Sequence, residues 1–346
     1  MFQKNLKFYR LKKRLSKKAL ADACSVTPMA ITHYEAGDRK PNMQVLEAIA
    51  AALDVRMSDL LKRRNARLAF CHGEFRKSDS LGKAEQGFVR ESVEEYFGRF
   101  YDAVEVLGGD VLPAAPKCGC LKLGENAEVD AAALRKNLGF SSVGPVYDFI
   151  KALEDRGFLV MSLPMENRAF SGMSGFVEGR PYIVLNSLAS LEHGRSTIAH
   201  ELAHLMFSWP EDLKGKALEA RVAAIGGAFL LPAADLRREL GLHRSSFTND
   251  MALVAHDYGV SVKLLGKRAN AAGIISDSAL RSLLSSSSNA QESESIQLRV
   301  SSEQPVFFDR LVCRAVCEND ISVQRGAELL NVEYVDLAAE CAPFKA

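Results

Sequence analysis

Apolar residues recur every three or four positions along the first sixty residues, which is the spacing of amphipathic helices. Ser16 and Thr27 stand where helix N-caps are expected, and Pro28 fits a first helical position because its missing N–H costs nothing there. A helix, a tight turn, a second helix and a supporting helix follow the plan of a helix-turn-helix unit. The expected helices cover residues 5–15, 17–24, 28–35 and 43–53, and residues 58–61 close the unit.

Later in the chain, helical spacing alternates with short apolar runs. Three runs predict the strands of a small antiparallel sheet, namely residues 158–163, 171–177 and 181–185. Helices are expected over residues 85–107, 129–138, 146–156, 234–240, 249–258, 259–271 and within 307–339. Residues 62–77 are charged and predict a linker. Residues 284–304 are rich in Ser, Glu and Gln, a composition that cannot bury a core, so they predict a flexible linker. The expected fold class is α+β and mostly helical.

One further helix is expected within the apolar run 197–207, and it carries the motif H-E-x-x-H. Residues four apart share a helix face, so His200 and His204 can direct their imidazoles at one metal ion. Glu201 lies one step round the helix, where it can take a proton from water at that metal. The motif predicts the chemistry of a zinc hydrolase.

A catalytic zinc usually has three protein ligands and one open position. Glu219 is the best candidate for the third ligand, because it opens a helix of small residues that can approach its neighbour closely. Glu211, Asp212 and His193 are weaker rivals. The alternative interpretation is a structural His/Glu pair on a core helix, which the matching carboxylate helix disfavours.

The residues that carry a wider resemblance are 176–186, 197–204, and 219–221 through 228–232. On these residues, the stretch from about 130 to 276 resembles the ImmA/IrrE family of zinc metallopeptidases, which often carry an attached helix-turn-helix domain. The resemblance implies Zn²⁺ as the cofactor, His200, His204 and Glu219 as its ligands, and Glu201 as the general base. Ala223 replaces a frequent Asn of the family, and residues 225–226 are Ile-Gly where the family often has Phe-Ala. These departures concern helix packing more than the ligands.

Charge separates the beginning of the chain from the rest. The whole chain has a net charge of +1, yet residues 1–64 carry fourteen Lys or Arg and six Asp or Glu. The remainder is correspondingly acidic, which suggests that the basic head meets a polyanion. Seven cysteines are scattered along the chain, as expected of reduced thiols, and Cys118-Gly-Cys120 is a weak candidate for metal binding or redox sensing.

The basic head also resembles the XRE/Cro-type helix-turn-helix family, on Leu20-Ala21, Val26-Thr27, Ile31-Thr32, Tyr34-Glu35 and Gly37, among other positions. The resemblance implies binding of double-stranded DNA through residues 1–64. The side chains that it places in the major groove are Thr27, Met29, Ala30, Thr32 and His33. Those that it places on phosphates are Lys17, Lys18, Arg39 and Lys40. The alternative is a small helical module that binds protein.

The expected domains follow from these assignments. They are a helix-turn-helix DNA-binding domain (1–64), a helical linker region (65–128), a zinc metallopeptidase domain (129–283), a Ser-rich linker (284–304) and a C-terminal helical segment (305–346). The C-terminal segment weakly repeats the helix-turn-helix pattern. The sequence has neither a signal-peptide core nor a run of 18 apolar residues, so a cytoplasmic protein with no membrane contact is expected.

The predicted function is a zinc-dependent endopeptidase with a DNA-binding head. The family resemblance implies a protein substrate, a transcriptional repressor or similar regulator, whose cleavage switches on stress, mobile-element or phage-defence genes. The main alternative is a transcription regulator or antitoxin whose peptidase-like domain senses a signal or binds a partner without hydrolysis. A zinc hydrolase of small amides is a weaker third interpretation. A homodimer is one open possibility, since XRE-type heads commonly read palindromes as dimers. His243, His256 and Tyr258 are weak candidates for oxyanion donors.

Overall fold

The computed structural model describes residues 1–62, 64–65, 67–73, 81–289 and 303–342. The chain divides into two compact units. The first unit combines residues 1–111 with residues 308–346, and the second comprises residues 112–307. The C-terminal helices therefore belong to the same unit as the N-terminal head, although some two hundred residues separate them in sequence.

The N-terminal head contains the five helices that the apolar spacing predicted. The side chains of Ser16, Thr27 and Asn42 each accept a hydrogen bond from the backbone N–H three residues later. Leu20, Ile31 and Ile49 are completely buried and form its core. The helices are α1 (Phe2–Lys12), α2 (Lys17–Ala23), α3 (Pro28–Ala36), α4 (Met43–Leu53) and α5 (Met57–Leu61). The first begins three residues earlier than expected.

The remainder of the first unit is built on α6 (Lys83–Val106), with a short strand β1 (Phe70–His72) before it. The C-terminal helices are α15 (Phe307–Cys317), α16 (Val323–Leu330) and α17 (Tyr334–Glu340). They pack on α6: the rings of Tyr96 and Phe308 meet edge to face with centroids 5.3 Å apart, and Arg99 donates to the Leu329 carbonyl. The strand β1 lies in a stretch that was predicted to be linker. Residues 63, 66 and 74–77 of that predicted linker lie outside the described residues.

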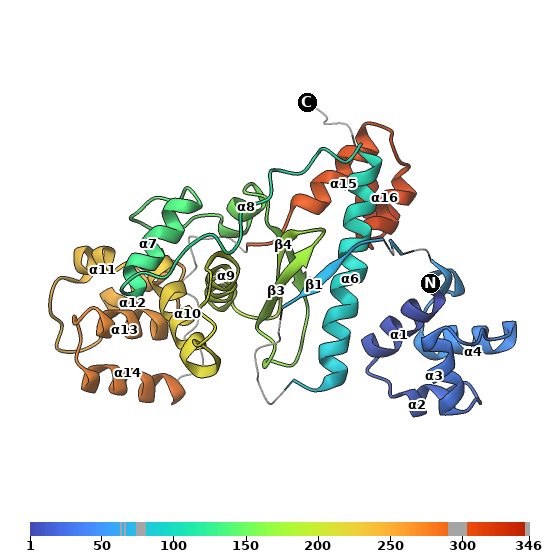
Figure 1. The fold of residues 1–346 in the computed structure, drawn as a ribbon, viewed down its shortest axis with the longest axis horizontal. Coiled ribbons are helices and arrows are strands. Elements are labelled where there is room, and N and C mark those ends of the chain that lie inside the picture. Colours follow the sequence, from blue (N-terminus) through green and yellow to red (C-terminus); the bar gives the residue numbers. More distant parts are fainter. Residues whose placement is uncertain (63, 66, 74–80, 290–302, 343–346) are drawn as a thin grey trace. The chain divides into compact units, whose positions relative to one another are not determined.

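The second unit is built around two neighbouring helices, α9 (Leu191–Met206) and α10 (Gly215–Leu230) (Figure 1). Ile198, Leu202 and Met206 on α9 are at most 1% exposed, as the apolar pattern predicted. Around this pair lie α7 (Ala127–Asn137), α8 (Phe149–Glu154), α11 (Ala233–Leu240), α12 (Asn249–Asp257), α13 (Val262–Ala271) and α14 (Asp277–Asn289).

The strands of the second unit are β2 (Leu159–Leu163), β3 (Gly172–Val177) and β4 (Arg180–Asn186), in the order β3-β4-β2. The strands β3 and β4 form the expected antiparallel hairpin, with Glu178 and Gly179 at positive φ in its turn. The strand β2 pairs with β4 in parallel, so the sheet is mixed, whereas an antiparallel sheet was predicted. The strands β2 and β3 are consecutive in sequence but are not paired, because β4 lies between them in the sheet.

The Ser-rich stretch differs in part from its prediction as a flexible linker. Residues 284–289 continue α14, because serine is only a moderately poor helix former and Leu280, Leu283 and Leu284 keep the helical spacing. At the other end, the buried Glu303 carboxylate accepts hydrogen bonds from Arg195 and from the Phe149 N–H. Residues 290–302 of the predicted linker lie outside the described residues.

A membrane-spanning helix was not expected. In the described part of the chain, no single helix combines the length and apolarity that a bilayer requires, while the bent pair of α10 and α11 meets the criterion on length and composition alone.

Candidate metal centre

The helix α9 presents both motif histidines on one face. His200 and His204 are one helical turn apart, and their Nε2 atoms are 3.0 Å from each other. The helix is fixed at its start by Ser190, whose side chain caps the His193 N–H, and its apolar face anchors it in the core. His200 is buried, whereas His204 is partly exposed. One side of the pair is thus accessible from outside.

The helix α10 brings a carboxylate to the same point. One Glu219 oxygen lies 3.2 Å from His200 Nε2 and the other lies 3.4 Å from His204 Nε2. The two helices approach closely because α10 has small residues where they meet. A Cβ atom on Gly226 would lie only 3.2 Å from the Ala199 carbonyl carbon and the His200 nitrogen.

The three side chains fit the requirements of Zn²⁺. Two imidazoles and one carboxylate form a ligand set of catalytic zinc sites, and their ligand atoms lie within 4.8 Å of one another. Ligands at zinc bond lengths in a tetrahedron are about 3.3 Å apart. The three separations in this cluster, 3.0, 3.2 and 3.4 Å, are close to that value. Among the described residues, no other group of three or more His, Cys, Asp or Glu side chains meets the same distance limit.

The rival ligands lie elsewhere. His193 is on the first turn of α9, where its Nε2 is 2.9 Å from the Ser171 hydroxyl. Glu211 and Asp212 follow the end of α9 and are exposed. None of the three belongs to the cluster that the described residues form.

The buried carboxylate of Glu201 contacts the sheet. Its Oε2 accepts a hydrogen bond of 2.7 Å from the Ser174 hydroxyl on β3. Residue 174 was expected in a strand but without a role, because serine in a strand has no distinguishing pattern. This bond links the strand next to α9 to the predicted general base.

Two more side chains support the site and were not identified from the sequence. Trp209 donates from Nε1 to the His204 carbonyl at 3.3 Å, beside the end of α9. Arg221, two residues after Glu219, forms an ion pair of 2.6 Å with the buried Asp130 and donates to the Gly124 carbonyl at 3.0 Å. The Arg221 contacts hold the beginning of α10 and therefore the position of Glu219.

Two of the three weak oxyanion candidates, Tyr258 and His256, have other contacts, and His243 is exposed. The Tyr258 hydroxyl accepts from Arg238 at 2.8 Å, and burial raises the pKa of Tyr258 to about 12. His256 lies 3.7 Å from the carboxylate of Asp257. These contacts favour packing roles. The thiol of Cys118 is partly buried, which raises its pKa to about 11 and disfavours a reactive thiolate.

In the head, the predicted DNA-contacting side chains lie along α2 and α3 and in the loop that follows. Lys18, Met29, His33, Arg39 and Lys40 are exposed, and Met29 is 63% accessible. Two other predicted contacts also have structural roles: Thr27 caps the Ala30 N–H at 3.2 Å, and Lys17 donates to Thr32 at 3.3 Å.

Comparison with known proteins confirms both resemblances. Residues 6–60 match the family model described as Helix-turn-helix, and residues 153–270 match the peptidase M78 model, described as IrrE N-terminal-like domain. The second match includes α9, α10 and the ligand cluster. Over 62 residues the chain is also 42% identical to the uncharacterized HTH-type transcriptional regulator YqaE of Bacillus subtilis. That match covers 18% of this chain and 53% of the relative, so the chain spans about half the relative's length.

Proposed function

We propose that this protein is a zinc-dependent endopeptidase that binds DNA through its head and cleaves a protein regulator of transcription. The helix-turn-helix match supports DNA binding and a regulatory function. The peptidase M78 match supports a metallopeptidase-like second unit. The observation that carries the proposal is the convergence of His200, His204 and Glu219 from two helices on a point that one metal ion can occupy.

In this mechanism His200, His204 and Glu219 hold the metal. Zn²⁺, when bound there, would supply Lewis acidity to a water molecule and to a peptide carbonyl. Glu201 accepts the proton of the attacking water and then donates it to the leaving amine. The Ser174 hydroxyl orients the Glu201 carboxylate through the bond of 2.7 Å.

A separate general base explains why the motif contains Glu201 in addition to the ligands. A pure zinc scaffold has no chemical need for a carboxylate at this position. The combination with a DNA-binding head favours a substrate that is itself found on DNA, such as a repressor, over small amides or general protein digestion.

The test uses the full chain loaded with zinc, with and without duplex DNA, mixed with repressors encoded beside its gene. The wild type should produce discrete fragments, and Glu201→Gln should produce none while retaining zinc and the wild-type circular dichroism spectrum. A matched control is Glu211→Gln, which removes an exposed carboxylate beyond α9. Cleavage by Glu201→Gln at the wild-type rate would contradict the mechanism. Zinc and DNA binding without any cleavage by the wild type would favour a non-proteolytic regulator.

A further inference from the structure

The C-terminal helices α16 and α17 repeat the local structure of α2 and α3. Each residue of 321–340 corresponds to the residue 306 positions earlier in the head. Ser322 caps α16 as Ser16 caps α2: each side chain accepts from the N–H three residues later, at 3.2 Å from Arg325 and at 3.0 Å from Ala19.

The turns between the helices also correspond. Asn331 has a left-handed φ of 59°, and its counterpart Ser25 has a φ of 53°. In both turns the next residue, a valine, donates its N–H to an alanine five residues earlier, at 3.1 Å for Val332 and 3.0 Å for Val26. This agreement in cap, turn and hydrogen bond identifies residues 321–340 as a second helix-turn-helix motif.

The interior of the motif is kept as well. Leu337 on α17 is 1% exposed and corresponds to the fully buried Ile31 on α3. Ala327 and Ala21, which accept the turn hydrogen bonds, are both buried. The second motif therefore has the backbone conformation of a DNA-binding helix-turn-helix motif.

Its charge is inverted. The phosphate-contact positions Lys17 and Lys18 correspond to Val323 and Gln324. Among the base-contact positions, Thr27 corresponds to Glu333 and Ala30 to Asp336. Because DNA affinity depends on cationic contacts with phosphates, carboxylates in these positions exclude DNA as the ligand of this motif.

The outer side of α17 combines these carboxylates with exposed apolar side chains. We call residues Glu333, Val335, Asp336 and Ala339 the acidic face; all four are exposed, and Val335 is 73% accessible. Val335 corresponds to Met29, which is 63% accessible in the head. Residues Lys18, Met29, Arg39 and Lys40 are the basic face of the head. Each face thus has an apolar side chain among charges, and the charges of the two faces are opposite.

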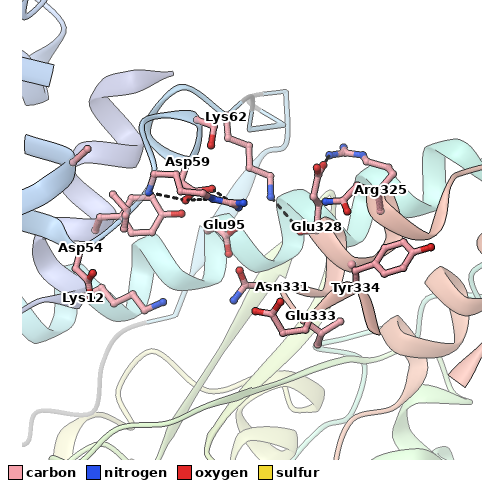
Figure 2. A pocket seen from close by; sticks show the side chains of 18 of the residues that line it. Lys12, Asp54, Asp59, Lys62, Glu95, Arg325, Glu328, Asn331, Glu333 and Tyr334 are labelled. Carbon is pink, nitrogen blue, oxygen red and sulfur yellow. Dashed lines mark hydrogen bonds and ion pairs between the residues drawn. The ribbon is translucent and has the colours of Figure 1, made fainter. Parts of the chain in front are cut away.

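Within one chain, the second motif borders a different part of the head. A pocket of about 1300 Å³ lies between them (Figure 2). From the head it is lined by residues of α1, of α4 and α5, and of the adjoining loops, including Lys12, Asp54 and Asp59, and not by residues of α2 or α3. Lys62 crosses to the second motif and donates to the Glu328 carbonyl at 3.1 Å. The basic face therefore lies outside this pocket, and its four side chains are exposed among the described residues.

We propose that the acidic face of one chain docks on the basic face of a second copy of this chain. Two such contacts related by a two-fold axis form a closed dimer, in which each acidic face covers the partner's DNA-reading surface. Duplex DNA and the second copy then compete for the basic face. This self-recognition does not depend on peptidase activity.

Sedimentation equilibrium of the full chain at low and high salt tests the proposal. We expect a dimer whose dissociation constant rises with salt, since opposite charges are screened. Val335→Lys with Asp336→Lys should weaken the dimer by about tenfold or more. The control is Glu318→Gln with Asp320→Lys, which changes the net charge equally at exposed positions before α16 and should leave the dimer intact.

A charge exchange identifies the partner surface. The head variant Lys18→Glu with Arg39→Glu should also be monomeric, and mixing it with the Val335→Lys/Asp336→Lys variant should restore a mixed dimer. A wild-type chain that stays monomeric, or a dimer that neither variant weakens, would overturn the proposal. Failure of the mixture to associate would do the same. The proposal would also be overturned if the head variant still bound DNA while the tail variant, Val335→Lys/Asp336→Lys, did not. If the tail variant does not fold, the head variant and Val335→Ala provide the same test.

Discussion

Gly226 provides a sensitive test of how the metal centre is assembled. A Cβ atom at this position of α10 would meet the Ala199 carbonyl carbon and the His200 nitrogen at 3.2 Å, both of them backbone atoms of α9. Comfortable carbon contacts are about 3.5–4.0 Å, so Gly226→Ala requires the helices to separate by roughly 0.3–0.8 Å. Backbone atoms of a buried helix cannot turn aside as a side chain can.

Two opposing effects determine the change in stability. Alanine gains about 0.5–1 kcal/mol over glycine inside a helix, while overpacking a close-packed interior costs about 1–3 kcal/mol. The expected net loss is therefore roughly 0–2.5 kcal/mol. Metal-ligand distances tolerate only about 0.2 Å, so the same movement should lower zinc affinity by about 10–100-fold, as the loss of supporting residues does.

The assay is thermal unfolding of the metal-free chain, followed by zinc titration against a competing chelator. Gly87→Ala on α6 is the matched control, because its Cβ would meet only Leu11 Cδ1 at 3.6 Å, an ordinary contact. The control should gain stability and keep its zinc affinity. If Gly226→Ala gained as much stability as Gly87→Ala with unchanged zinc affinity, the role assigned to the close approach would be wrong.

Three further predictions concern single carboxylates and the Ser174 hydroxyl. Glu219→Gln should lower zinc affinity far more than Glu211→Gln, as measured by the same titration, because only Glu219 lies within 3.4 Å of both imidazoles. Ser174→Ala should leave zinc affinity unchanged and reduce kcat for the proposed cleavage, since it removes the bond that orients Glu201. Hydrogen bonds from His72 and Lys4 lower the pKa of the Glu94 carboxyl from 4.5 to about 2. The ionised carboxylate therefore stabilises the folded state fully above pH 4.5, and this contribution is lost as the pH falls towards 2. Between pH 4.5 and 2, the free energy of unfolding of Glu94→Gln should fall by about 1–2 kcal/mol less than that of the wild type, allowing for solvent screening. An acid unfolding transition identical to that of the wild type would contradict this prediction.

The elements that carry the candidate site could be predicted because their signals are local. The spacing of His200 and His204 defines a helix face, and the small residues after Glu219 indicate a close helix contact. Caps such as Ser16 and Thr27 fixed the helices of the head. In each of these cases the informative residues lie within a few turns of one another.

The remaining features depend on contacts between distant residues. The insertion of β4 between β2 and β3 is not encoded in the alternation of any one strand, so the parallel pair was missed. Ser174 gained its role only when β3 was placed beside Glu201. Glu303 looked like part of a linker until its carboxylate met Arg195, more than one hundred residues earlier.

The discontinuous first unit also sets the order in which the protein is completed during synthesis. Its last piece, residues 308–346, leaves the ribosome only after the whole of the second unit. At roughly 5–20 residues per second, residues 112–307 alone require about 10–40 s. Throughout that interval Tyr96 and Arg99 lack the C-terminal helices that they contact in the finished chain. One side of α6 is therefore exposed in the nascent chain during this time. An exposed surface of this kind can bind chaperones or aggregate with other chains.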